Sequence, residues 1–394
     1  MAELTFLGRT NWRDRIRPFG LRELDRRAHM YVIGKTGTGK SSLLEFMIRQ
    51  DIANGRGLAL LDPHGDLAER IVAWVPDSRR ADLIYLNVPD PTQPFGFNPL
   101  QGVPVLKRSL AANGIVEALK KMFAESWGYR MEHILRAALL LLLDQPVATI
   151  ADVLRLFHEP DFRVEAATRA TNPHVARFWT TEFPAFGKLT KEAVSPIENK
   201  LGSFLIDPFL TRILTASEST FSPEEVLRKG QLLVVNLAKG KIGETPAALF
   251  GGLLVSALGV AGLGRAEAAD SSESFYMYLD EFQTFTTLAL ANMLAELRKY
   301  GVGLILANQF LDQLVPEVRA SILGNVATLL VFRVGAGDAV RLAKELGGAS
   351  EPEDLILLPN RSFWIRPLVL GEAVPAFTGS ALSTIRQPSP PNSL

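Results

Sequence analysis

Cysteine is absent from this chain of 394 residues. Disulfide bonds, cysteine-ligated zinc and thiol catalysis are therefore excluded, and a reducing cytoplasm is compatible with the composition. Histidine is scarce, and none of the five histidines lies four positions from another, so no transition-metal site is expected. Net charge is also absent, because 42 basic residues balance 42 acidic ones. This balance excludes a uniformly basic nucleic-acid binder, so any contact with nucleic acid must be local.

Long apolar runs are rare, and no signal peptide opens the chain, since residues 9–27 are polar. One uncharged stretch, residues 246–264, approaches the length of a membrane span. It contains five glycines and a serine, and it lies between two predicted core strands. We therefore expect a helix buried in an α/β core, no intrinsic membrane span and a soluble protein.

Short, continuously apolar runs alternate with helical patterns along much of the chain. Continuous apolarity is typical of strands covered on both faces, so the alternation predicts an α/β fold with a mainly parallel sheet wrapped by helices. The predicted strands are 29–33, 57–62, 83–87, 232–237, 275–280, 302–307 and 327–334. The predicted helices between them are 41–54, 246–262, 288–300, 311–323 and 338–346.

The alternation stops in residues 102–220, where only helical patterns of apolar residues occur. We predict an all-helical insertion there, within a discontinuous α/β domain of residues 28–101 and 221–378. Residues 379–394 are predicted to form a disordered tail rich in proline and serine. Residues 1–27 form a basic arm with seven arginines against four acids. We expect this arm to be solvated, the alternative being a patch that faces phosphates.

The most informative motif lies between a predicted strand and a predicted helix, where Gly34, Gly39, Lys40 and Ser41 fit the P-loop pattern G-x-x-x-x-G-K-[ST]. Its glycines let backbone N–H groups turn toward phosphate oxygens, and the following helix start adds a positive dipole. Lys40 can then reach the β- and γ-phosphates, and the Ser41 hydroxyl can bind Mg²⁺. The predicted cradle is Gly34, Lys35, Thr36, Gly37, Thr38, Gly39, Lys40, Ser41 and Ser42. The alternative is an ordinary glycine-rich turn.

Hydrolysis needs further groups, and the apolar strand ending in Asp280 and Glu281 supplies two of them. Asp280 is predicted to hold Mg²⁺. Glu281, which the strand period turns the other way, is predicted to polarise the attacking water. Gln309, just past another strand, can sense the γ-phosphate or cap the next helix. Asp62 and His64 follow a rival strand and either line the nucleotide pocket or form a simple turn.

These motifs, in this order, resemble the FtsK–HerA group of P-loop motors, and most closely the conjugative coupling ATPases of the TraD/TraG type. The match covers roughly residues 17–378. The segments that carry it are Gly34–Ser41, Asp62–Leu67, Gly96–Pro99, Asp280–Phe285, Glu296–Tyr300, Asn308–Gln309 and Phe332–Arg333.

The resemblance implies a RecA-like motor domain that uses ATP and Mg²⁺, usually as a homo-oligomeric ring of six, to move DNA. It implies that Arg298 reaches into the neighbouring subunit's site, although sequence alone would read Arg298 as a helix C-terminal arginine. Arg333 is the alternative trans-acting finger. The helical insertion is implied to receive DNA or a relaxase.

Coupling proteins usually begin with transmembrane helices, which this sequence lacks, so we expect a cytoplasmic protein that can lie peripherally at the inner face of a membrane channel. The predicted function is an ATP-dependent DNA translocase or coupling ATPase in conjugative transfer. DNA, a relaxase and secretion-channel proteins are the expected partners. The alternatives are an ATPase for protein export or pilus assembly in type IV secretion, and a nucleotide-controlled scaffold.

Overall fold

The computed structural model describes residues 4–11, 16–93, 95–123, 127–267 and 273–382. The chain divides into two compact units. Unit 1 comprises residues 1–87, 224–238 and 261–394, and unit 2 comprises residues 88–223 and 239–260. Residues 239–260, predicted to belong to the α/β domain, thus fall in unit 2; the predicted domain borders themselves remain a prediction.

Unit 1 is built on an 11-stranded sheet with the order β2-β1-β13-β10-β9-β3-β8-β7-β4-β6-β5. The seven strands from β9 to β5 are parallel, which gives the mainly parallel sheet predicted from the sequence. Their bounds are β3 Met30–Ile33, β4 Gly57–Asp62, β5 Leu83–Asn87, β6 Leu232–Asn236, β7 Phe275–Leu279, β8 Val302–Asn308 and β9 Thr328–Val331.

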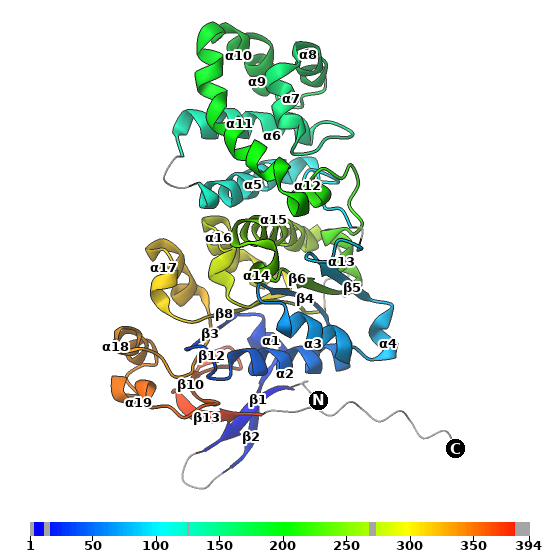
Figure 1. Ribbon diagram of the computed structural model, residues 1–394. Coiled ribbons are helices and arrows are strands. Elements are labelled where there is room, and N and C mark those ends of the chain that lie inside the picture. Colours follow the sequence, from blue (N-terminus) through cyan, green and yellow to red (C-terminus); the bar gives the residue numbers. More distant parts are fainter. Residues whose placement is uncertain (1–3, 12–15, 94, 124–126, 268–272, 383–394) are drawn as a thin grey trace, which may run out of the picture. The chain divides into compact units, whose positions relative to one another are not determined.

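Helices cover both faces of this parallel sheet (Figure 1). The connection from β3 to β4 runs one way along the sheet, whereas those from β7 to β8 and from β8 to β9 run the other way. Right-handed crossovers therefore place α2 on one face and α16 and α17 on the opposite face. The helices of this unit are α1 Glu23–Arg26, α2 Lys40–Ala53, α3 Asp66–Trp74, α4 Asp77–Arg80, α13 Pro223–Lys229, α16 Leu288–Leu297, α17 Pro316–Asn325, α18 Ala336–Glu345 and α19 Pro352–Ile356.

Four antiparallel strands that the sequence did not indicate extend the sheet beyond β9. They are β1 Leu4–Thr10, β2 Pro18–Arg22, β10 Ser362–Arg366 and β13 Phe377–Ala381. A hairpin of β11 Leu368–Val369 and β12 Glu372–Ala373 lies between the last two in sequence. Residues 379–381 of the predicted disordered tail are therefore in a strand, and residues 383–394 lie outside the described part.

The described part of the basic arm, residues 4–11 and 16–27, forms β1, β2 and α1, whereas Arg13 and Arg15 lie outside the described residues. Arg9, Arg17 and Arg22 are exposed, as a solvated arm requires, but Arg26 departs from that expectation.

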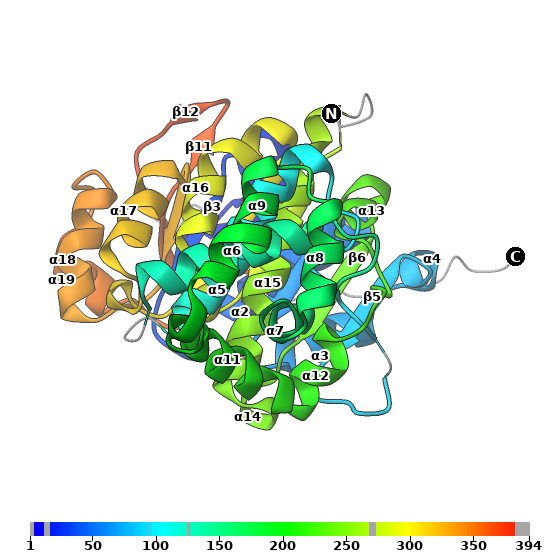
Figure 2. The same cartoon turned by 90° about the horizontal axis from the view of Figure 1, so that it is seen from above.

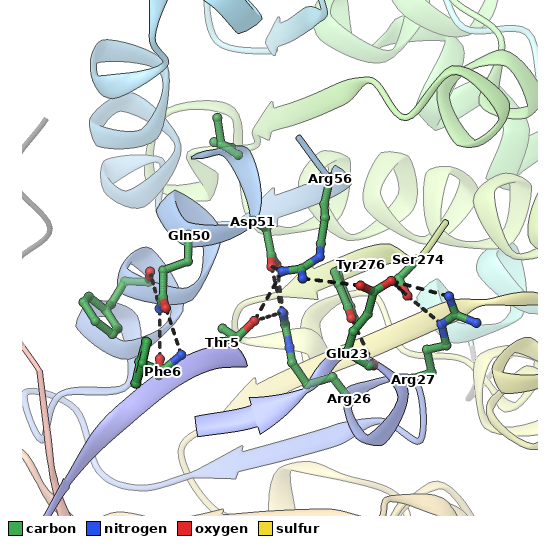
Figure 3. Close-up of polar contacts among 12 residues, drawn as sticks. Thr5, Phe6, Glu23, Arg26, Arg27, Gln50, Asp51, Arg56, Ser274 and Tyr276 are labelled. Carbon is green, nitrogen blue, oxygen red and sulfur yellow. Dashed lines mark hydrogen bonds and ion pairs between the residues drawn. The ribbon is translucent and has the colours of Figure 1, made fainter. Parts of the chain in front are cut away.

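Arg26 is fully buried, and its guanidinium donates to both carboxylate oxygens of Asp51 and to Thr5 (Figure 3). It also donates to the hydroxyl of Tyr278. A buried charge is tolerated only when it is paired and hydrogen-bonded, and this one is. The guanidinium also lies 3.8 Å above the ring of Tyr276.

A second layer of polar contacts surrounds this ion pair (Figure 3). Arg56 donates to Asp51 at 3.1 Å and to Glu23 at 3.4 Å. Arg27 donates to Ser274 at 2.5 Å, and Ser274 donates in turn to Glu23. The arm is therefore held by a network whose members come from two parts of unit 1 that are far apart in sequence, residues 5–56 and 274–278.

Unit 2 contains helices and no strand in its described residues. α6 is apolar on most of its circumference, and it packs against α5, α7, α8, α9 and α11 (Figure 2). Trp179, fully buried, donates from its indole nitrogen to the carbonyl of Ala137 on α6 at 3.1 Å. The helices are α5 Arg108–Met122, α6 Tyr129–Leu143, α7 Asp152–His158, α8 Pro160–Thr168, α9 Pro173–Arg177, α10 Phe183–Ala185, α11 Thr190–Ile206, α12 Pro208–Leu214, α14 Lys239–Ile242 and α15 Glu244–Leu263.

In the described residues, α15 is the one helix long and apolar enough to cross a membrane. Its most apolar window has a mean hydropathy of 1.9 and is 83% buried within the protein. The helix expected from the uncharged stretch is therefore present and mostly buried. A buried core helix has this length and composition too, so α15 gives only weak support for a membrane span.

Candidate nucleotide site

Apart from Arg298, the predicted site residues lie at the carboxyl ends of four adjacent parallel strands, in the order β3, β8, β7 and β4. Parallel strands end at one edge of the sheet, so the P-loop, Gln309, Asp280 and Asp62 lie side by side there. Ligands of open α/β folds bind at this carboxyl edge. The site is therefore a direct consequence of strand order, and all of it lies within unit 1.

One close approach and two positive φ angles explain the glycines of the P-loop. A Cβ at Gly34 would lie 2.5 Å from the Cβ of Phe332, so no larger side chain fits. Gly37 and Gly39 have φ angles of 76° and 120°, in the range that favours glycine. The loop leads directly into α2, which begins at Lys40 and presents its free N–H groups there.

The side chain of Lys40 is 5% exposed and folded back onto its own loop. Its Nζ donates to the carbonyl of Gly34 at 2.5 Å and lies 3.9 Å from Oε1 of Glu281. Burial lowers the pKa of Lys40, although the carboxylates of Glu281 and Asp280 oppose this effect. A bound phosphate chain would offer the same ammonium group stronger, anionic acceptors.

Ser41 and Asp280 meet as the Mg²⁺ prediction requires. The hydroxyl of Ser41 donates to Oδ2 of Asp280 at 3.1 Å, so both oxygens can face one small cation. Burial raises the pKa of Asp280 to about 6, with further contributions from Asp62 and Glu281. A magnesium ion would offset this crowding of buried negative charge, and hydroxyl and carboxylate oxygens are the ligands it prefers. The residues present therefore fit Mg²⁺.

Glu281 is 5% exposed and adopts a left-handed conformation with φ of 44°. A residue other than glycine in this conformation is strained, and such strain is concentrated at functional sites. The amide of Gln283 donates to Oε2 of Glu281 at 2.8 Å. Glu281 is thus held between Gln283 and Lys40 at the edge where a phosphate would bind.

The carboxylate of Asp62 accepts hydrogen bonds from the turn and the helix start that follow its strand. Its Oδ1 accepts from the backbone of His64 at 2.9 Å, and its Oδ2 accepts from Leu67 and Ala68 at 2.8 and 3.0 Å. Asp62 therefore caps the start of α3, whose free N–H groups need such an acceptor. The side chain of His64 is exposed on this turn. The simple-turn reading describes both residues better than a pocket-lining role.

Gln309 follows β8, between the P-loop strand and the strand of Asp280. The preceding Asn308 is fully buried and accepts from the hydroxyl of Tyr31 at 2.8 Å, which fixes the turn. The backbone of Gln309 donates to the side chain of Gln313, so Gln313 performs the capping considered for Gln309. Gln309 itself lines an open pocket of about 540 Å³ together with Lys35 and Thr36.

Arg298 lies at the opposite edge of the sheet from the P-loop. It begins the short 3-10 turn Arg298–Tyr300 that precedes β8, and it is exposed. Among the described residues its side chain has no ion pair or hydrogen bond. The positive charge of Arg298 contributes to lowering the pKa of His29, whose ring forms a hydrogen bond with the carbonyl of Leu294 at 2.6 Å. In its own subunit Arg298 therefore cannot reach the P-loop.

Arg333, the alternative finger, follows β9 at the same edge as the P-loop. Its guanidinium donates to the carbonyl of Leu358 at 3.3 Å and to the side chain of Asn360 at 2.8 Å. Its own carbonyl accepts from Lys35 of the P-loop at 2.9 Å. Arg333 is thus engaged within its own subunit and less suited to act in trans than the exposed Arg298.

Sequence reasoning missed the contact of Gln283 with Glu281 and the capping by Asp62. A signal existed for the second one, because Asp62 is followed by proline, glycine and then a helical pattern, which is typical of a helix start. No signal existed for the first, since the conformation of Glu281 cannot be derived from residue types.

Comparison with known proteins confirms the resemblance inferred from the motifs. Residues 24–80 match the family model "Helicase HerA, central domain", and residues 274–351 match "TraM recognition site of TraD and TraG". No curated protein matches the chain. The two matched segments contain the P-loop and the Asp280–Gln309 region, respectively.

Solved structures show that the fold is that of a RecA-like P-loop NTPase. The plasmid coupling protein TrwB in complex with ADP and Mg²⁺ has a TM-score of 0.68 at 18% identity, over 92% of this chain and 87% of that chain. Its complex with a non-hydrolysable ATP analogue gives the same TM-score over 94% and 88%. VirB4 of Thermoanaerobacter pseudethanolicus has a TM-score of 0.65 at 14% identity, over 98% and 97%.

Proposed function

We propose that this protein is an ATPase of conjugative type IV secretion that couples ATP hydrolysis to the movement of DNA. The observation that carries the proposal is the meeting of Ser41 with Asp280 and of Lys40 with Glu281 at one edge of the sheet. The similarity to TrwB and to the TraD and TraG model supports the conjugative setting.

In the proposed reaction, Lys40 leaves the carbonyl of Gly34 and binds the β- and γ-phosphates of ATP. Ser41 and Asp280 are the residues that would hold Mg²⁺, and the ion would supply positive charge to offset that of the phosphates. Glu281, oriented by Gln283, accepts the proton of the attacking water, and Gln309 orients that water. Charge that develops on the transferred group is offset by Arg298 of a neighbouring subunit, an effect worth about 10³–10⁵ in rate where arginine fingers act.

The proposed assembly is a ring of six copies, the number that the resemblance implies. An Arg298 that is exposed and remote from its own P-loop supports contact with a neighbouring subunit. A ring also gathers a few basic side chains from each subunit around one pore, which reconciles DNA binding with zero net charge. A relaxase and secretion-channel proteins are the further partners, at the cytoplasmic face of a membrane channel.

The test is the rate of ATP hydrolysis with and without single- and double-stranded DNA. We expect DNA to raise the rate at low salt and the effect to fade at high salt, because phosphate contacts release counterions. Glu281→Gln serves as the hydrolysis-deficient control. If the protein hydrolyses no ATP under any of these conditions, the proposed ATPase activity is refuted.

A second candidate function is an ATPase that powers protein export in type IV secretion, and the likeness to VirB4 over almost the whole chain favours it. Fold alone does not choose between DNA and protein as cargo. The same assay separates the two, because an export ATPase should hydrolyse ATP at a rate indifferent to either form of DNA at low salt.

A further inference from the structure

The connection that precedes β10 lies against the P-loop. The backbone N–H of Arg361 donates to the carbonyl of Thr38 at 2.8 Å, and the carbonyl of Arg361 accepts from Ala381 at 2.8 Å. A Cβ at Gly39 would lie 3.4 Å from the Cα of Arg361 and 3.5 Å from its Cγ. The stem of this arginine therefore runs alongside the glycine that immediately precedes Lys40.

Arg361 has a strained backbone conformation. Its φ of 66° is left-handed, a conformation that is strained for an arginine and unstrained for glycine. The side chain is exposed, and among the described residues its guanidinium has no hydrogen-bond or ion-pair partner. Packing therefore does not explain why an arginine stands here.

Arg333 holds the same connection from its other side. It bonds to Leu358 and Asn360 through its guanidinium, and to Lys35 through its carbonyl. Two arginine positions thus tie residues 358–361 to the beginning and the end of the P-loop, and Arg333 acts as the positioning residue. The result is a positive charge without a partner beside a loop built to hold phosphates.

We propose that Arg361 binds the phosphate chain of the nucleotide held by the P-loop of the same subunit. This inference rests on the proposed nucleotide binding at Lys40 and adds a ligand to that site. Because Thr38 and Gly39 lie at the part of the loop that leads into α2, the contact is to phosphates that ADP and ATP share. Arg361 should therefore tighten both nucleotides and leave turnover at saturation unchanged, unlike an arginine that acts only in the transition state.

The decisive variant is Arg361→Gly, which removes the guanidinium while relieving the left-handed conformation. Leu370→Gly is its matched control, because Leu370 is also exposed and left-handed, with φ of 57°, in the β11–β12 hairpin. Both variants should melt at or above the temperature of the parent protein. Arg361→Lys tests whether charge alone suffices, and Arg80→Ala removes an exposed arginine elsewhere in unit 1.

The measurement is the Kd for ADP, ATP and inorganic tripolyphosphate by calorimetry, with kcat and KM for ATP. We expect Arg361→Gly to weaken all three ligands about tenfold or more, a typical result for one lost charge-assisted contact, with kcat within about twofold of the parent. Arg361→Lys should recover part of the loss, and the Leu370→Gly and Arg80→Ala controls should bind as the parent does.

Unchanged binding of ADP by a stably folded Arg361→Gly protein would overturn the inference. A loss for ATP that spares tripolyphosphate would also overturn it, because the contact would then be to the nucleoside. If the parent protein itself binds no nucleotide, the proposed function fails instead, so the two failures are distinguishable.

Discussion

The side-chain amide of Gln283 donates to Oε2 of Glu281 at 2.8 Å, while Nζ of Lys40 lies 3.9 Å from Oε1 of the same carboxylate. Each oxygen of Glu281 thus faces a different partner. Lys40 is also the residue proposed to bind phosphate, so nucleotide binding would draw it away from Glu281. Gln283 would then remain to orient the carboxylate toward water.

Gln283→Ala should lower kcat about tenfold and leave the KM for ATP nearly unchanged, because orientation of a general base matters only in the chemical step. Steady-state kinetics check this split. Gln145→Ala is a suitable control, since the amide of Gln145 bonds to the carbonyls of Leu141 and Ala166 in unit 2 and has no part in the site. A rise in KM with an unaltered kcat would show that Gln283 acts in binding.

Glu281→Gln should bind ATP normally and hydrolyse it at least ~100-fold more slowly, as expected when a general base is removed. Nucleotide affinity and single-turnover hydrolysis are the measurements. Retention of most of the parental rate would exclude Glu281 as the base.

Asp62→Asn should act on stability instead of chemistry. One of the two capping oxygens becomes an amide that cannot accept, so the start of α3 loses hydrogen bonds at a cost of about 1–3 kcal/mol. Urea unfolding measures the loss, and ATP hydrolysis at a temperature where the variant is folded should stay near the parental rate. An Asp62→Asn protein with normal stability but no activity would contradict this prediction and show that Asp62 acts in catalysis.

Arg298→Ala should fold and bind ATP yet be inactive alone, since its guanidinium would complete only a neighbour's site. Mixing it with inactive Lys40→Ala should restore some hydrolysis, because some interfaces then pair an intact Lys40 with an intact Arg298. The measurement is activity across a mixing series in which subunits exchange. No recovery at any ratio, with a monomer by light scattering in ATP, would remove both the ring and the trans-acting arginine.

Acid should destabilise the protein through His29. Burial lowers the pKa of His29 from 6.5 to about 4, and the nearby Arg298 adds to this effect. Between those two pH values the unfolded chain binds a proton that the folded protein does not, so stability is fully present above pH 6.5 and declines toward pH 4. One group with this shift accounts for about 3 kcal/mol.

The measurement is the free energy of unfolding in urea at several pH values for the parent and for His29→Asn, since asparagine tolerates the left-handed φ of 67° at this position. The variant should show a shallower slope between pH 6.5 and pH 4. If the free energy of unfolding falls equally steeply with pH in both proteins, groups other than His29 cause the acid sensitivity.

The parallel part of the sheet could be predicted because its strands, such as β4 and β8, are buried on both faces and read as continuous apolar runs. The antiparallel strands could not. β1 contains a glycine and an arginine, and it pairs with β13 more than 300 residues away, so no local pattern reveals it. At the site, residue types and strand order were enough to bring Ser41 to Asp280. The orientation of the Asp62 side chain could not be predicted, because it is set by the backbone N–H groups that donate to it in the folded protein.

Arg26 joins the C-terminal end of α2 to β7, the two elements that lead from and to the nucleotide site. Asp51 lies in the last turn of α2, whose first residue is Lys40, and Tyr278 lies in β7, two positions before Asp280. A single guanidinium bonded to both acts as a mechanical brace that resists sliding of the helix along the strand. Arg26 thereby helps to fix the distance between Ser41 and Asp280 although it lies outside the nucleotide site. Because Arg26 also donates to Thr5 of β1, a displacement of the N-terminal strands would change the distance between Ser41 and Asp280.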